Sequence, residues 1–227
     1  MIFTIPIWAD LLAIGIGSLQ GALFAAQFRD RKLDLLGVAI IGIATGFGGG
    51  IIRDLLLSEV PAALQGNWYL PVAVGSALVG MLLERLFQRL RQLITVLDAL
   101  TIGLFGAIGT TKALALGLPE IPAIFVGVIS AVGGSILRDL LLNVPIALMS
   151  VGSLYAVAAL VGTTSLVSLV ALGVDITLAA VICVALTFVV RVLAVLFEWT
   201  LPEQVALRRR RRPIAPGTGN IPTRGDS

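Results

Sequence analysis

The sequence Gly48-Gly49-Gly50-Ile51-Ile52-Arg53-Asp54-Leu55-Leu56-Leu57 returns later in the chain as Gly133-Gly134-Ser135-Ile136-Leu137-Arg138-Asp139-Leu140-Leu141-Leu142. The arginines of the two copies are 85 positions apart, and a proline follows each copy, Pro61 and Pro145. Outside the motif, Asp10 matches Asp98 at a spacing of 88. Self-similarity of this kind is the signature of an internal duplication. The sequence therefore predicts a fold built from two related halves.

The composition places both halves in a membrane. Hydrophobic residues make up 58% of the chain and charged residues 13%, and the mean hydropathy is +1.04. This is more apolar side chain than one soluble core of this length would hide. Because roughly 20 apolar residues cross the hydrocarbon as a helix, we expect seven spans. They cover about residues 10–28, 33–58, 68–83, 93–116, 121–142, 154–170 and 175–199.

The expected fold is an all-α membrane protein with two inverted three-helix repeats and a seventh helix. We expect the first repeat at 1–92, the second at 93–172, the seventh helix at 173–200, and a basic disordered tail at 201–227. Since each repeat holds an odd number of spans, the second must enter the membrane from the opposite side. The repeats are then related by a pseudo-twofold axis in the membrane plane. The seventh helix has no counterpart in the duplication.

Basic residues predict the orientation. With a cytoplasmic C-terminus, the inner connections hold 12 of the 16 Lys and Arg residues, whereas the outer connections hold only Lys112. We therefore expect the N-terminus outside and the C-terminus inside a cell (inner) membrane. The inner set consists of Arg29, Arg31, Lys32, Arg85, Arg89, Arg91, Arg208 to Arg212 and Arg224.

The glycines of the motif predict an interruption of the second and fifth spans. Three successive residues without side chains, Gly48, Gly49 and Gly50, make a continuous helix unfavourable, and Gly133, Gly134 and Ser135 repeat the pattern. Broken helices in inverted repeats expose backbone groups near the midplane. We expect the spans to be kinked or broken here, with the two breaks facing each other. The alternative is that these glycines only allow close helix packing.

The charges of the motif then fall near a polar centre. Charged residues inside a membrane suggest a functional site by default. They are also candidates for reciprocal ion pairs that lock the repeats together, and this structural role and direct ion contact stay equally open. The expected pairs are Arg53 with Asp139 and Arg138 with Asp54.

Other polar residues are weaker candidates for a pathway. They are Asp10, Asp98, Lys112, Thr45 and Ser130. For the two aspartates the alternative is an interfacial position, and Lys112 and Arg191 are expected to extend toward the membrane surface instead. Hydroxyl groups and carbonyls freed at the breaks would suit a permeant potassium or sodium ion.

Residues missing from the sequence exclude several chemistries. The chain has no histidine and one cysteine, Cys183, which removes Ser-His-Asp and Cys-His catalysis and any intrachain disulfide. We expect no enzyme, no cofactor and no metal beyond a transient permeant ion. The run Arg208 to Arg212 follows a membrane span directly, so we expect it to anchor the topology and attract anionic membrane lipids, with no nucleic-acid partner.

The doubled Gly-Gly-Gly/Ser-x-x-Arg-Asp-Leu-Leu-Leu motif, each copy followed by a proline, resembles the prokaryotic trimeric intracellular cation channel family. The resemblance covers about Asp10 to Phe197 of the 227 residues. It implies a homotrimer in which each subunit has its own pore, lined by spans 1, 2, 4 and 5. It also implies kinks at Gly48 to Gly50 and Gly133 to Ser135 and conduction of monovalent cations, chiefly potassium; Ser135 departs from the triple glycine.

A second function class stays open at this point. Related bacterial sequences are also labelled glycine transporters, and inverted repeats serve secondary transporters as well as channels. A transporter of glycine or another small amino acid would need a midplane site and alternating access, whereas a channel needs one continuous polar path.

Overall fold

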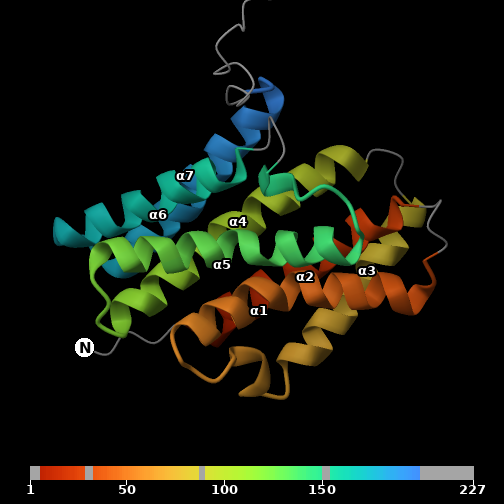
Figure 1. Cartoon of the computed structure of the whole chain (residues 1–227), viewed down its shortest axis with the longest axis horizontal. Helices are drawn as coiled ribbons and strands as arrows, with labels where there is room; N and C mark the ends of the chain where they lie inside the picture. The colour runs from red at the N-terminus through yellow and green to blue at the C-terminus, as the bar shows by residue number, and fades with distance from the viewer. Residues whose placement is uncertain (1–5, 29–32, 87–89, 150–153, 200–227) are drawn as a thin grey trace, which may run out of the picture.

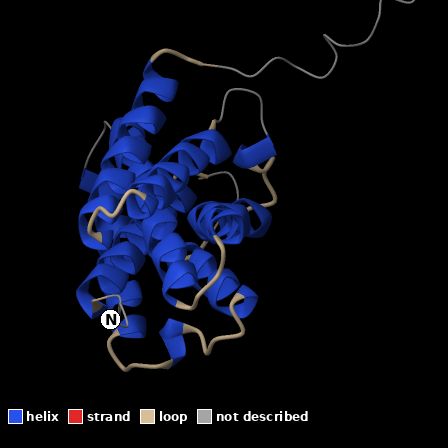
Figure 2. Ribbon diagram, turned by 90° about the vertical axis from the view of Figure 1, so that its left-hand side faces the viewer, coloured by secondary structure: helices blue, strands red, loops and turns tan. Residues whose placement is uncertain are grey.

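The computed structural model describes residues 6–28, 33–86, 90–149 and 154–199, and within them every regular element is helical (Figures 1 and 2). Two single-turn 3-10 helices, η2 (Ala62–Leu64) and η3 (Ala147–Met149), follow α2 and α5. The seven α-helices are α1 (Ile7–Ala26), α2 (Leu35–Leu56), α3 (Tyr69–Leu86), α4 (Leu90–Ala115), α5 (Glu120–Leu141), α6 (Tyr155–Ala171) and α7 (Ile176–Leu196).

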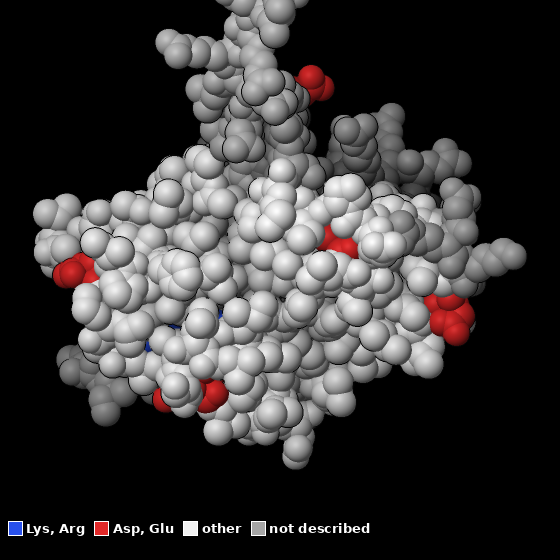
Figure 3. Space-filling view, in the orientation of Figure 1, with Lys and Arg blue, Asp and Glu red and all other residues white. Residues whose placement is uncertain are grey.

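The helices have the length and composition of membrane spans. Five of those described, α1, α2, α4, α5 and α7, are long and apolar enough to cross a bilayer, and α3 and α6 contribute the shorter apolar stretches Tyr69–Leu83 and Tyr155–Ala171. Large apolar side chains such as Leu36, Ile121 and Leu172 face outward. The surface in Figure 3 is correspondingly almost free of charge over the helices. The predicted all-α membrane fold with seven helices is confirmed.

Local chemistry fixes where the helices begin and end. The Asp34 side chain accepts a hydrogen bond of 2.6 Å from the Gly37 N–H at the start of α2, and Asp175 caps α7 in the same way. After α2 and α5 the chain turns at Ser58 (φ 56°) and Asn143 (φ 47°). These residues are 85 positions apart, so both copies of the motif end in the same left-handed turn.

Four helices form the centre of the molecule. Helices α1, α2, α4 and α5 pack against one another, α3 covers α1 and α2, and α6 and α7 cover α4 and α5 (Figure 1). Helix α7 is more than an addition to the repeats. A Cβ placed on Gly15 of α1 would meet α3 at Ser76, whereas one on the equivalent Gly103 of α4 would meet α7 at Val184. Helix α7 therefore takes on α4 the position that α3 takes on α1.

The expected break in α2 and α5 is wrong. Helix α2 continues through Gly48–Gly50, and α5 continues through 133–135. The physical reason is that a buried helix keeps its own backbone hydrogen bonds, and the missing side chains allow a neighbour to approach closely instead. A bend within a continuous helix stays a prediction.

The orientation in the membrane also stays a prediction. Most basic residues that support it lie outside the described residues or have side chains that the structure does not describe. The repeat boundaries stay a prediction as well, and the predicted tail at 201–227 lies outside the described residues.

Candidate functional site

The two glycine motifs face each other where α2 crosses α5. A Cβ on Gly49 would overlap the carbonyl oxygen of Ser130, and one on Gly134 would overlap the carbonyl oxygen of Thr45. These two contacts are exchanged by the 85-residue shift between the repeats. The earlier residue of α2, Thr45, meets Gly134, and the later one, Gly49, meets Ser130. The two helices therefore run antiparallel. The expectation that the motifs face each other is confirmed, with close packing as the role that the geometry supports.

A second pair of contacts follows the same symmetry. A Cβ on Gly48 would lie 2.7 Å from Leu137 Cδ1, and one on Gly133 would lie 2.9 Å from Ile52 Cδ1. The same two Cβ positions would lie 3.1 Å from Gly134 Cα and 3.2 Å from Gly49 Cα, so backbone atoms of the two helices also approach closely here.

The third motif position lies off the crossing. The nearest atom to a Cβ on Gly50 would be a Phe105 ring carbon at 3.8 Å. The equivalent Ser135 donates a 2.8 Å hydrogen bond to the Val132 carbonyl of its own helix. This explains why serine replaces glycine in the second copy: only the first two positions touch the opposite helix.

The motif charges lie at opposite ends of the bundle. Arg53 lies C-terminal to the crossing in α2, and Arg138 lies C-terminal to it in α5. Because the two helices are antiparallel, the arginines lie on opposite sides of the crossing. The expected shared polar centre is therefore wrong. The expected pairs Arg53–Asp139 and Arg138–Asp54 are wrong as well, because each arginine folds back onto its sequence neighbour. A long side chain with a fixed donor fork reaches a carboxylate that starts about 100° away around the helix.

The first cluster consists of Asp10, Arg53, Asp54 and Lys112. Arg53 Nε donates to Asp54 Oδ1 at 2.7 Å, and Arg53 Nη1 lies 3.5 Å from Asp10 Oδ1. The Lys112 ammonium donates to Asp54 Oδ1 at 2.8 Å, so the expectation that it extends toward the membrane surface is wrong. The Ala62 N–H of η2 donates to Asp54 Oδ2 at 2.8 Å. Two cations thus balance two carboxylates, as burial of charge requires.

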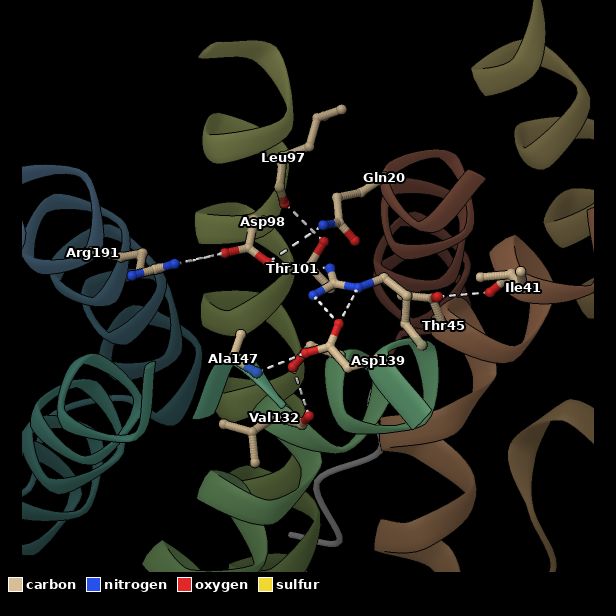
Figure 4. A network of polar contacts seen from close by, with 12 residues as sticks. Gln20, Ile41, Thr45, Leu97, Asp98, Thr101, Val132, Asp139, Ala147 and Arg191 are labelled. Carbon is tan, nitrogen blue, oxygen red and sulfur yellow. Dashed lines mark hydrogen bonds and ion pairs between the residues drawn. The ribbon is translucent and has the colours of Figure 1, made fainter. Parts of the chain in front are cut away.

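The second cluster consists of Asp98, Arg138, Asp139 and Arg191. Figure 4 labels the two aspartates and Arg191. Arg138 Nη2 lies 2.7 Å from Asp139 Oδ1, and the Ala147 N–H donates to Asp139 Oδ2 at 2.8 Å. Asp98 is held less closely: Arg191 Nη2 is 3.3 Å from its Oδ2 and Arg138 Nη1 is 3.9 Å from its Oδ1. The expectation that Arg191 extends to the membrane surface is wrong, because it is buried and paired with Asp98.

Each repeat also reaches the cluster of the other. Lys112 and Phe24 are 88 positions apart and so hold the same place in α4 and α1. Lys112 pairs with Asp54 of the first repeat, whereas Phe24 packs its ring 3.9 Å beneath the Arg138 guanidinium of the second. On the α7 side the Arg191 guanidinium lies 3.8 Å over the Tyr155 ring. Cations above aromatic faces are attracted by the ring quadrupole.

Sequence reasoning missed Gln20, Phe24 and Tyr155 and misplaced Lys112 and Arg191. The Gln20 amide donates to Asp98 Oδ1 at 3.4 Å. For Arg191 the sequence did carry a signal. This arginine lies inside α7, the most apolar of the candidate spans, and a charge in such a helix needs a buried counter-charge. No comparable signal existed for the uncharged residues.

The two hydroxyl candidates lie at the crossing. Thr45 and Ser130 are both buried. The Thr45 hydroxyl donates a hydrogen bond of 2.6 Å to the Ile41 carbonyl, one turn earlier in its own helix. The Ser130 hydroxyl has no hydrogen-bond partner among the described residues. Their role in a pathway stays a prediction, as does that of Asp10 and Asp98.

Comparison with known proteins extends over most of the chain. The family model described as "Glycine transporter" matches residues 7–85 and 95–171. A UPF0126 membrane protein of Deinococcus radiodurans is 34% identical over 157 residues, which cover 68% of this chain and 72% of the relative. The UPF0126 inner membrane protein YadS of Escherichia coli K12 is 30% identical over 199 residues, 86% of this chain and 94% of the relative.

Solved structures share the fold. A crystal structure of a TRIC trimeric intracellular cation channel orthologue from Rhodobacter sphaeroides superposes with a TM-score of 0.78 at 31% identity, covering 85% of this chain and 98% of that one. A second structure, of a TRIC cation channel described for its conductance, gives a TM-score of 0.77 at 30% identity, covering 88% and 98%.

Proposed function

Since this chain belongs to the membrane-protein family described as "Glycine transporter" and folds as the TRIC cation channels do, we propose that it is a monovalent cation channel. The observation that carries the proposal is the structural match to a TRIC channel at 31% identity over 85% of the chain. The family model, which matches residues 7–85 and 95–171, covers both copies of the doubled motif. The proposed ion is potassium, with sodium as a second permeant cation.

The proposed path runs between α1, α2, α4 and α5, whose mutual packing forms the centre of each subunit. A cation entering at either end would meet a cluster that contains two carboxylates, Asp10 with Asp54 or Asp98 with Asp139. Between the ends it would meet the Thr45 and Ser130 hydroxyls. The backbones of α2 and α5 approach each other closely at the crossing, so in this proposal conduction requires the two helices to separate there.

The proposed assembly is a homotrimer with one such path per subunit. The trimeric description of a structural neighbour supports it, and the apolar outer surface of the helices is compatible with packing of copies within the lipid. The label of the relative YadS supports an inner-membrane location.

A transporter of glycine or another small amino acid is the second candidate, and the description of the matching family model favours it. An ensemble flux assay distinguishes the two. Proteoliposomes loaded with potassium and free of valinomycin should release potassium rapidly once a counter-ion can move to balance the charge. The same proteoliposomes should show no saturable glycine uptake. Saturable glycine uptake without potassium flux would reverse the order of the two candidates.

A further inference from the structure

The two clusters are built alike but differ in the space beside them. The cavity at the first cluster, lined by Asp10, Arg53 and Asp54, has a volume of about 10 Å³, which is roughly the room one water needs. The cavity at the second cluster, lined by Asp98, Arg138 and Arg191, has a volume of about 290 Å³. Only the second has room for a small molecule.

The charge of the lining also differs. The first cavity is lined by one cation and two carboxylates. The second is lined by two arginines and one carboxylate, because Asp139 lies behind Arg138 and does not reach the cavity. The second cavity is therefore electropositive, and the first is not.

The buried side-chain atoms that line the second cavity and lack a hydrogen-bond partner among the described residues are donors. The Nη1 atoms of Arg138 and Arg191 have no hydrogen-bond partner among the described residues, and these side chains are 1% and 7% exposed. An unsatisfied buried charged donor costs more than a neutral one. Asp98, in contrast, accepts from Gln20 and Arg191. A ligand that only accepts hydrogen bonds would satisfy the donors.

Both guanidinium groups are held in place before any ligand arrives. The Arg138 guanidinium carbon lies over the Phe24 ring and that of Arg191 over the Tyr155 ring, at 3.9 and 3.8 Å from the centroids. Stacking uses the faces of a guanidinium and leaves its N–H groups free in the plane. A planar carboxylate accepts from such groups in a geometry that a single ammonium does not provide.

We propose that the cavity lined by Arg138, Arg191 and Asp98 binds a small soluble carboxylate anion, held by the two guanidinium groups. The site includes Asp98, which we place at one end of the proposed ion path, and its occupancy would place a negative charge at that end. The ligand binds whether or not the protein conducts.

Acetate is the probe that tests this site. The full chain, purified in a neutral detergent, is titrated with sodium acetate replacing sodium chloride at constant ionic strength, while the thermal unfolding midpoint is recorded. A saturable rise in the midpoint is expected, since a ligand that binds only the folded protein stabilises it. A midpoint that does not respond to acetate would overturn the proposal.

Two variants separate this site from general salt effects. Arg191→Lys keeps the charge but loses the planar donor group, and should weaken acetate binding about tenfold or more, the equivalent of a lost charged hydrogen bond. Gln27→Trp fills the cavity from the exposed end of α1 and should abolish binding with both arginines intact. Leu64→Trp, an exposed position at the opposite cluster, is the matched control and should bind acetate normally.

The source of the anion is tested in the same preparation. If both site variants bind acetate as the unaltered protein does, the site is elsewhere and the assignment fails. If acetate has no effect and only added phosphatidylglycerol raises the midpoint, the cavity recognises a lipid phosphate and the soluble-carboxylate proposal is wrong.

Discussion

At the residue scale, two sets of four charges contain every buried charged side chain of the part of the chain that the structure describes. Each motif arginine binds the aspartate beside it and extends toward the aspartate near the start of its repeat, Asp10 or Asp98. The motif aspartate, Asp54 or Asp139, also accepts a hydrogen bond from the backbone N–H eight residues later, that of Ala62 or Ala147. The duplicated sequence thus encodes a duplicated ion-pair geometry within each repeat, while Lys112, Phe24 and Gln20 each reach the cluster of the other repeat.

Asp54 is the most highly connected carboxylate of the first cluster, so its removal has the clearest consequence. Asp54→Asn leaves Arg53 and Lys112 without their shortest partner, and a broken buried pair costs about 3–5 kcal/mol. In a double-mutant cycle with Lys112→Gln, we expect a coupling energy of about 1–3 kcal/mol, measured by reversible unfolding in mixed detergent.

A matched pair tests the separation of the two clusters. Arg53→Gln and Asp139→Asn share no partner in the structure, so their effects on the free energy of unfolding should add within about 0.5 kcal/mol. Coupling between Arg53 and Asp139, or simple additivity between Asp54 and Lys112, would contradict the ion-pair arrangement described above.

At the element scale, the crossing of α2 and α5 is what the motif glycines determine. Their lack of a side chain brings two helix backbones into contact, and the helices remain continuous because their hydrogen bonds are internal. The first two glycines of each copy are required by this contact, and the third position is open enough for Ser135.

Alanine substitution should distinguish these positions. Gly134→Ala places a methyl group against the Thr45 carbonyl and should cost about 1–3 kcal/mol, as overpacking does. Gly50→Ala meets nothing closer than 3.8 Å and should stabilise α2 by up to about 1 kcal/mol, the helix preference of alanine over glycine. Unfolding midpoints of the two single variants are the measurement. Equal effects at both positions would mean that the glycines do not determine the approach of α2 to α5.

The sequence predicted the elements well and their partners poorly. Apolar run lengths predicted seven helices, and the duplication predicted that the two motifs face each other. The predicted break in α2 and α5 is wrong because the low helix propensity of glycine applies to helices in water. In lipid the backbone groups of a helix have no other hydrogen-bond partners, so the helix stays continuous. That error moved Arg53 and Arg138 to the midplane and so produced the wrong ion pairs. The partners Lys112 and Arg191 depend on which helix faces lie together, which no local pattern encodes.

At the scale of the whole molecule, the arrangement is a core of four helices with apolar covers. The opposed directions of α2 and α5 agree with repeats that enter the membrane from opposite sides. Helix α7 completes the second half by occupying the place on α4 that α3 has on α1, and by supplying Arg191 to Asp98.

Accessibility to a thiol reagent tests the predicted orientation. In a Cys183→Ala background, a cysteine at Gly117, between α4 and α5, should react with an impermeant maleimide added to intact cells. A cysteine at the exposed Met149, between α5 and α6, should react only after permeabilisation. The opposite pattern would place the N-terminus inside and reverse the orientation of both repeats.

The most direct test of the proposed function is single-channel recording of the purified protein in a planar bilayer under a potassium chloride gradient. We predict unitary current steps whose reversal potential lies close to the potassium equilibrium potential, because the Asp10 and Asp54 carboxylates at one end and the Thr45 and Ser130 hydroxyl groups at the crossing favour a cation. The absence of unitary steps from protein that is folded and inserted, or a reversal potential close to that of chloride, would contradict a cation channel.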